Sequence, residues 1–198
     1  MKKFLRIAYQ YYLTNKFNKK ALLKGKIDFC RKTRISLIDG SKREDIILGD
    51  KSRVHCILVS QHSGKIIFHE NVQIGYSSFI GSVNHIEIQE GTVISNNVTI
   101  VDNNNHSVNP EDRIKMQNSP WNSNFRKWRY SVSSPIKIEK NVWIGQYARI
   151  NKGVTIGFNS IVAANTVVTK DVPPNSIIAG NPGRIVKSEI QKEPQLIC

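Results

Sequence analysis

Aliphatic residues recur at every sixth position in the C-terminal half of the chain. Two residues before most of them lies a small or β-branched residue, and residues two apart in a strand point to the same face. The pattern therefore predicts short strands that turn once in every six residues, with both marked positions buried. The aliphatic positions are Ile138, Ile144, Ile150, Ile156, Val162 and Val168, and their partners are Val142, Ala148, Val154, Ser160 and Thr166.

A strand that turns every six residues forms neither a flat sheet nor a helix. It winds the chain into a coil of short flat sides, an all-β solenoid, in which buried residues stack from coil to coil. The same period is present upstream at Ile88, Ile94 and Ile100, and the step of eight from Ile80 to Ile88 indicates two inserted residues. Residues 27–70 contain looser strand-like runs, which we interpret as irregular early coils.

The period stops after Ile100 and resumes near Ile136. The segment between them is polar, contains three prolines and has no sustained hydrophobic period, so we predict a loop excursion over residues 101–135. Its aromatic residues stand among basic ones, which indicates an ordered loop that faces a ligand.

Two terminal segments flank the predicted solenoid, which covers residues 26–172. Residues 1–25 have the spacing of a basic amphipathic helix that extends to about residue 23 and is ended by Gly25. Residues 173–198 are expected to leave the coil, because consecutive prolines at 173 and 174 cannot continue a strand ladder.

The net charge of +14 is concentrated at the N-terminus. Residues 1–34 hold 11 of the 29 basic residues and one acid, Asp28, so they carry +10 and the remaining residues carry +4. Two interpretations of the N-terminal helix are open: it lies on an anionic membrane surface, or it packs against its own domain or a sister subunit. No nucleic-acid-binding module accompanies the charge, so we predict no nucleic-acid partner.

The cysteines and the hydropathy pattern indicate a cytoplasmic protein. Cys30, Cys56 and Cys198 fit neither a disulfide framework nor a zinc site, and no apolar run reaches the length of a membrane span. The basic start of the chain lacks the cleavage site of a secretion signal. Peripheral contact with the inner membrane face is the expectation if the N-terminal helix binds lipid.

Three segments carry a family resemblance: NVWIG at 141–145, VVTKDVPP at 167–174 and IAGNP at 178–182. They resemble the hexapeptide-repeat acyltransferases, and within them the sugar O-acetyltransferases that include galactoside and maltose acetyltransferases. The resemblance covers residues 72–187. It implies a left-handed parallel β-helix, a homotrimer with active sites between subunits, and acetyl-CoA as a co-substrate with no bound cofactor.

Acyl transfer from a thioester to a hydroxyl needs a base for the hydroxyl proton and a donor for the developing oxyanion. Histidine suits the base, because its unperturbed pKa lies within about one unit of neutrality. His106 stands at the start of the excursion, where the family's catalytic histidine also stands, and is our predicted general base. Asp102 would either orient the ring of His106 or cap the loop. We interpret the other histidines as surface or coil-turn residues: His55, His62, His69 and His85.

The resemblance assigns cofactor contacts to Trp143, Gln146, Ala164, Thr169, Lys170, Arg184 and Lys187. Trp143 alternates with buried neighbours, so its ring is expected to face outward. Asn97 resembles a residue that reaches the acceptor sugar, although an ordinary turn asparagine would look the same. Aromatic rings stack on sugars and guanidinium groups bind acids, so loop residues are candidate acceptor contacts, although a trimer contact would use the same ones. These are Trp121, Arg126, Trp128 and Arg129.

The combined prediction is an acetyl-CoA-dependent O-acetyltransferase that modifies a hydroxyl of a bacterial surface glycan of the capsule or O-antigen type. Basic loop residues favour an acidic sugar such as sialic acid. Two alternatives stay open, namely a sugar N-acetyltransferase that acts on an amino sugar nucleotide and a non-enzymatic solenoid scaffold. A metal-dependent carbonic anhydrase of the same fold would need three histidine ligands, which the coil beside His106 lacks, so no metal is predicted.

Overall fold

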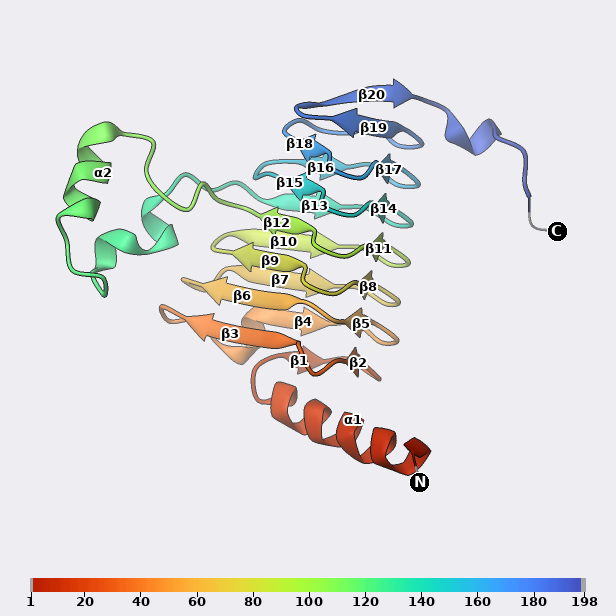
Figure 1. Cartoon of the computed structure of the whole chain (residues 1–198), viewed down its shortest axis with the longest axis horizontal. Helices are drawn as coiled ribbons and strands as arrows, with labels where there is room; N and C mark the ends of the chain where they lie inside the picture. The colour runs from red at the N-terminus through yellow and green to blue at the C-terminus, as the bar shows by residue number, and fades with distance from the viewer. Residues whose placement is uncertain (1, 197–198) are drawn as a thin grey trace.

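The computed structural model describes residues 2–196, with side chains described from residue 5 onward (Figure 1). Helix α1 (Lys2–Asn18) leads into a stack of short strands, which in this part of the chain form three sheets along the length of the stack. Each full coil contributes one strand to each sheet, and neighbouring coils pair in parallel. The predicted solenoid, wound as in a left-handed parallel β-helix, is confirmed.

We call the sheets A, B and C, in the order in which each coil visits them. Sheet A contains β1 (Leu22–Leu23), β4 (Ile46–Leu48), β7 (Lys65–Phe68), β10 (His85–Ile88), β13 (Ile136–Ile138) and β16 (Thr155–Ile156). Sheet B contains β2 (Asp28–Phe29), β5 (Arg53–Val54), β8 (Gln73–Ile74), β11 (Val93–Ile94), β14 (Trp143–Ile144), β17 (Ile161–Val162), β19 (Ile177–Gly180) and β20 (Gly183–Lys187). Sheet C contains β3 (Arg34–Ile38), β6 (Ile57–Gln61), β9 (Phe79–Ser82), β12 (Thr99–Val101), β15 (Arg149–Ile150) and β18 (Val167–Val168).

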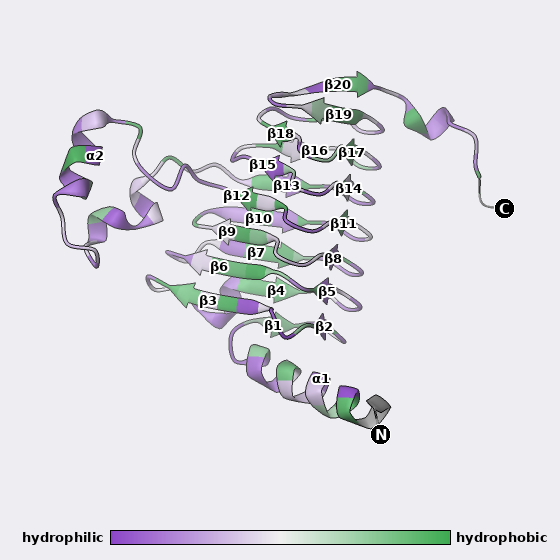
Figure 2. Cartoon of the chain, in the orientation of Figure 1, coloured by the Kyte–Doolittle hydropathy of each residue, from purple (hydrophilic) through white to green (hydrophobic). Residues whose placement is uncertain are grey.

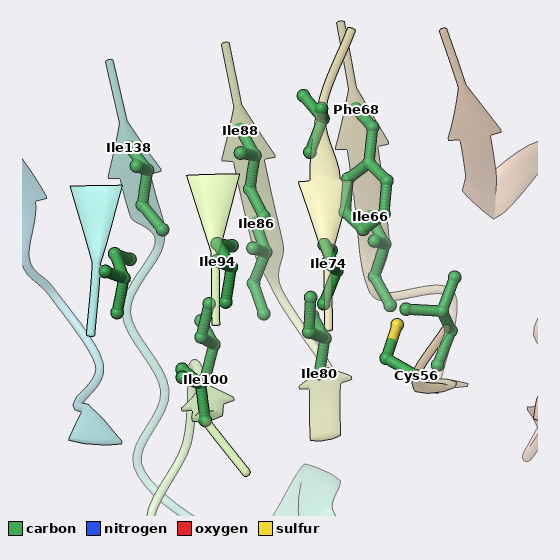
Figure 3. Close-up of a cluster of buried hydrophobic side chains, with 14 of the residues drawn as sticks. Cys56, Ile66, Phe68, Ile74, Ile80, Ile86, Ile88, Ile94, Ile100 and Ile138 are labelled. Atoms are coloured by element: carbon green, nitrogen blue, oxygen red, sulfur yellow. The ribbon is translucent and has the colours of Figure 1, made fainter. Parts of the chain in front are cut away.

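The positions that the six-residue period marks fill the interior of the stack, and all of them are buried. Like residues lie above one another: Ile88 pairs with Ile138, and Ile94 pairs with Ile144. Figure 3 shows this column of isoleucines together with Phe68 and the buried thiol of Cys56. Each buried aliphatic side chain contributes roughly 2 kcal/mol of transfer free energy, so the repeat is the main source of stability.

The early coils are irregular in length, as their sequence indicates. Leu22 pairs with Ile47, a step of 25 residues, whereas Ile47 pairs with Ile67 and Ile67 pairs with Glu87, two steps of 20. The later coils step by 18, as Lys137 pairs with Thr155. The extra residues lie at the corner where sheet C turns into sheet A, which we call the C–A corner, and they hide the six-residue period without disturbing the stack.

Helix α1 is shorter than predicted. It ends at Asn18 rather than near residue 23, because Leu22 and Leu23 pair with β4 and begin sheet A. The helix is held to the first coil by Leu13 and Phe17, which are buried. The rings of Phe17 and Phe29 lie with their centroids 4.7 Å apart.

The C-terminal segment also differs from the prediction. Pro173 and Pro174 lie in the turn before sheet B rather than in a strand, so the ladder continues past them and β19 pairs in parallel with β17. Strand β20 then turns back antiparallel to β19. The chain leaves the stack only after Lys187.

Candidate functional site

The predicted excursion is an arm, residues 102–135, that leaves the stack after β12 and returns at β13 (Figure 1). Its outer part contains a helix that the sequence pattern did not predict, α2 (Pro110–Gln117). Asn109 caps this helix by accepting a hydrogen bond from the amide of Glu111 at 2.8 Å, and Pro110 occupies its first turn. Its side chains are not buried, so α2 has no apolar period from which it could be recognised.

Asp102 fastens the base of the arm to the stack. Its carboxylate is fully buried and accepts hydrogen bonds from the hydroxyl of Ser82 at 2.6 Å and from the amides of Val83 and Asn84 at 3.0 and 2.9 Å. The Asn103 amide adds a fourth contact at 3.2 Å. No hydrogen bond joins Asp102 to His106 in the part of the chain that the structure describes. Of the two roles left open for Asp102, these contacts favour the cap, because its acceptor sites are occupied by the preceding coil.

A second set of contacts holds the returning half of the arm. The ammonium of Lys127 lies 2.6 Å from the carboxylate of Asp39, which lies beyond the end of β3, and its hydrogen bond lowers the pKa of that carboxyl below the ordinary value. The guanidinium of Arg129 lies 3.6 Å from the other oxygen of Asp39. The amide of Trp128 donates to the side chain of Gln61 at 3.0 Å. The arm is therefore tied to three successive C–A corners.

These contacts give most of the four candidate acceptor residues a structural role in the arm. Trp128 packs edge-on against Phe79, with ring centroids 6.2 Å apart, and Arg129 faces Asp39, so both anchor the arm. Arg126 donates to backbone carbonyls of its own loop and lies 4.6 Å from the ring centre of Trp121. Trp121 is 88% exposed. Only Trp121 of the four is left free to contact an acceptor, because the others are used to hold the arm's shape.

His106 is exposed on the outgoing half of the arm, between two hollows. The smaller, of about 170 Å³, lies on the α2 side and is lined by Met116, Phe125 and Tyr130 among others. The larger, of about 540 Å³, lies between the arm and the C–A corner of the next coil. The structure thus brings a free imidazole to the rim of a cavity, which is the placement that a general base requires.

The larger cavity contains three cations that the sequence did not single out. Arg113 comes from α2, Arg149 from β15 and Lys152 from the turn after it. They meet only because the arm folds back over the next coil, and no local pattern signals that contact. Together with the side chain of Asn151 they form a basic, hydrogen-bonding surface that suits an anionic group.

Asn97 lies at the corner between sheets B and C. It has a positive φ of 59°, as do Ser77, Tyr147 and Asn165 at the same corner of other coils. Asparagine tolerates this left-handed conformation better than most residues. The turn role is therefore sufficient to explain Asn97, and its side chain is half-buried.

The seven predicted cofactor residues lie in two groups at opposite edges of sheet C. The first group is on sheet B and the corner after it: Trp143, Gln146, Ala164, Arg184 and Lys187. Trp143 is 53% exposed on β14, as its alternation predicts. The second group, Thr169 and Lys170, follows β18 at the C–A corner, above the turn that carries Asn151 and Lys152. One chain therefore places only the second group on the same side as His106.

The remaining histidines and cysteines make structural contacts. His55 is buried beside Asp28 at 3.1 Å and beside the ring of Tyr76, rather than exposed. His69 pairs with Glu87 at 2.8 Å, and His62 turns a corner with a positive φ. Burial raises the pKa of the Cys56 thiol far above its usual range, and Cys198 lies outside the described residues. Among the described residues, no group of histidine, cysteine or carboxylate side chains could hold a metal ion.

The chain is similar to known acetyltransferases over part of its length. Residues 135–170 match the family of bacterial transferases with the hexapeptide motif in six repeats. The galactoside O-acetyltransferase of Escherichia coli K12 is 36% identical over 124 residues, which cover 60% of this chain and 61% of that protein. WbbJ of the same strain, named as an O-acetyl transferase of lipopolysaccharide biosynthesis, is 34% identical over 124 residues, covering 63% of this chain and 61% of that protein. The matches span about three fifths of the length of both relatives.

Two solved structures share the fold. A hexapeptide-repeat acetyltransferase of Vibrio cholerae, complexed with acetyl-CoA, superposes with a TM-score of 0.55 and 27% identity, covering 91% of this chain and 76% of that one. The N-acyltransferase AntD of Bacillus cereus, in complex with dTDP and 3-hydroxybutyryl-CoA, gives a TM-score of 0.66 at 22% identity, covering 90% and 87%. At that identity, the likeness to AntD concerns the fold alone.

Proposed function

We propose that the chain is a member of the hexapeptide-repeat acetyltransferase family and that it transfers an acetyl group from acetyl-CoA to a hydroxyl of a carbohydrate. The observation that carries the proposal is the position of His106, an exposed imidazole at the rim of a basic cavity beside the C–A corner. Acetyl-CoA is a co-substrate in this scheme, and the protein needs no resident cofactor.

In the proposed reaction both substrates are bound together and the transfer is direct. His106 removes the proton of the acceptor hydroxyl as its oxygen attacks the thioester carbonyl. The tetrahedral intermediate collapses with cleavage of the carbon–sulfur bond, and the proton held by His106 passes to the departing thiolate. Asp102 has no part in the proton transfer, and its role is to hold the strand from which His106 extends.

A second copy of the chain completes this site. Within one chain, the Trp143 group and His106 lie at opposite edges of sheet C, so one acetyl-CoA molecule bound by the Trp143 group would not reach His106 of the same chain. Side-by-side packing in a closed ring sets the sheet B edge of one subunit against the arm of its neighbour. We therefore infer a homotrimer with three active sites, each built from two subunits.

This arrangement is tested by mixing two impaired variants, each altered in one half of the site, at an acetyl-CoA concentration well below the dissociation constant. In a random mixture of His106→Ala and Trp143→Ala chains, about one quarter of the interfaces would pair an intact His106 with an intact Trp143. Activity should therefore return to about a quarter of the wild-type value per site. No recovery above the two parent variants, measured on co-refolded mixed trimers, would mean that each subunit carries its own complete site. The matched control mixes wild type with the double variant.

For the acceptor we propose an acidic unit of a bacterial surface glycan, of the capsule or O-antigen type. Arg113, Arg149 and Lys152 surround the cavity beside His106, and a carboxylate or phosphate of the acceptor would be held there. The test is thiol release from acetyl-CoA with neutral, sialylated and uronic-acid saccharides and with an amino sugar nucleotide side by side. Transfer to the amine would favour the N-acetyltransferase alternative, and no thiol release with any acceptor would favour a scaffold.

A further inference from the structure

Helix α1 exposes more apolar surface than its contact with the stack requires. Leu5, Tyr9 and Tyr12 stand at intervals of four and three residues, so they form one stripe along the helix. They are 61%, 42% and 57% exposed, and the rings of Tyr9 and Tyr12 stack with centroids 6.1 Å apart. The helix lies at the N-terminal end of the stack, with hydrophobic and hydrophilic residues alternating along it (Figure 2). An exposed apolar stripe of this kind marks an interaction surface.

A groove lies on the opposite side of the helix from this stripe, because Ile7 and Tyr11, which line it, are each two residues from Tyr9 and so about half a turn around the helix. It has a volume of about 770 Å³ and lies between α1 and the first two coils. Ile7 and Tyr11 line it from the helix, and Ile27 lines it from the first coil. Arg6, Lys26 and Lys51 also line it, together with Asp28, so the groove is bordered mainly by cations.

The charge around the helix is mainly positive, and the one acid that lines the groove, Asp28, is paired with Arg53 at 3.5 Å. Residues 1–27 contain eight lysines and arginines and no acid. Lys16 continues the stripe beyond Tyr12, and Arg6 and Lys26 flank the groove. A partner that covers this surface must therefore offer negative charge around apolar material, which is the chemistry of an anionic lipid surface.

A second copy of this chain is a poorer match. Each chain carries a net charge of +14, so contact between two such ends would bring like charges together. Tyrosine is also suited to the boundary between headgroups and acyl chains, since its ring is apolar and its hydroxyl is polar. In the part of the chain that the structure describes, no helix has both the length and the hydrophobicity for a membrane span, so the contact would be a surface contact.

We propose that the exposed face of α1 docks the protein on an anionic membrane, with the helix lying in the plane of the surface. This docking is independent of the proposed acetyl transfer, because the arm and strand β14, which carries Trp143, lie away from α1 (Figure 1). Substitutions are the suitable test, since Leu13, Phe17 and β1 belong to the folded stack and cannot be deleted without exposing its core.

Vesicle co-sedimentation of the full chain tests the proposal. The probes are vesicles of equal parts phosphatidylglycerol and phosphatidylcholine, and vesicles of phosphatidylcholine alone. One variant removes the stripe (Leu5→Gln, Tyr9→Gln, Tyr12→Gln), and a second removes charge (Arg6→Gln, Lys16→Gln, Lys26→Gln). A matched control replaces exposed apolar residues at the opposite end of the molecule (Val186→Gln, Leu196→Gln).

We expect the wild type and the control to bind the anionic vesicles, and the wild type to bind neutral vesicles far more weakly. Removing three cations should weaken binding about 100-fold, and removing the stripe should weaken it at least about 10-fold. The substituted side chains are exposed, so thermal unfolding should be unchanged, and the charge variant tests the proposal even if the stripe variant is unstable.

Absence of wild-type binding, or equal binding to both kinds of vesicle, would overturn the proposal. A change of oligomeric state in the stripe variant, without vesicle binding by the wild type, would identify a contact between copies instead.

Discussion

The hydroxyl of Ser82 donates a 2.6 Å hydrogen bond to the carboxylate of Asp102, although the two residues lie in successive coils. Both groups are fully buried, and the same carboxylate caps the amides of Val83 and Asn84 at the corner that contains the two inserted residues. This contact fixes the point from which the arm starts, four residues before His106.

Asp102→Ala should therefore destabilise the fold by about 3 kcal/mol, because several buried donors lose their acceptor at once. Asp102→Asn keeps one carbonyl oxygen and should be milder. Denaturant unfolding measures the effect. The pH dependence of kcat/KM separates the two roles of Asp102: an anchor leaves the shape of the profile unchanged in Asp102→Asn, whereas a shift would restore the orienting role.

His106→Asn should lower acetyl transfer by about 100-fold to 10,000-fold, which is the usual contribution of a general base. Thermal stability should be unchanged, since the side chain is exposed. His62→Asn is the matched control, because His62 is also exposed and asparagine accepts its positive φ. Equal loss of activity in both variants, or full activity in His106→Asn, would contradict the assignment.

Gly81→Ala should loosen the arm without unfolding the stack. A Cβ at Gly81 would lie 2.8 Å from the ring of Trp128, so the indole must move off the face of sheet C. We expect faster amide hydrogen exchange in the returning half of the arm and slower acetyl transfer. In a Trp128→Ala background the same substitution should have little further effect, and additive effects in this double-mutant cycle would show that the two residues act separately.

Trp143→Ala should weaken acetyl-CoA binding about tenfold, because a large exposed ring is removed from the face assigned to the donor. Isothermal titration with acetyl-CoA gives the dissociation constant directly. Val93→Ala, one coil below in the same row of sheet B, is the matched control and should bind acetyl-CoA normally. An unchanged affinity in Trp143→Ala would place the donor on another face.

The stability of the protein should decrease as the pH falls below neutrality, in part through His55. Burial lowers the pKa of His55 below 6.5, although Asp28 at 3.1 Å opposes this shift, and Arg53 favours it. A lowered pKa means that the unfolded chain binds the proton first, so acid favours unfolding between the unfolded and folded pKa values. His55→Gln, compared with wild type by thermal unfolding from pH 7 to pH 5, should show a smaller loss. An equal loss in both would assign the effect to other groups.

The sequence predicted those features that depend on burial within one coil. Ile138 and Val142 reveal the solenoid because every coil must bury the same two positions. The early coils and the end of α1 were harder to predict from the sequence. Residues inserted at corners interrupt the six-residue period, and the start of β1 directly after the helix leaves no periodic signal. The role of Asp102 was left open for a different reason: its partners lie about a coil earlier, and no spacing rule specifies them.

The contacts of the arm were even harder to predict from the sequence, because they join distant residues. Lys127 and Asp39 are separated by 88 positions, and their 2.6 Å contact decides that the basic end of the loop serves as an anchor. Composition identified Trp128 and Arg129 as noteworthy but could not distinguish binding an acceptor from binding the stack. Arg113, Arg149 and Lys152 were missed because they come from separate segments that meet only across the arm.

The two ends of the stack also determine how far the molecule can extend. The terminal coil of a parallel β-helix can act like the growing end of a fibre. Its strands have unpaired backbone N–H and C=O groups, to which another chain of the same geometry could pair. Here α1 lies across the first coil, and β20 reverses direction after β19, so neither end offers a complete three-sided template. The molecule is thereby limited to a fixed length, and assembly is directed to its sides.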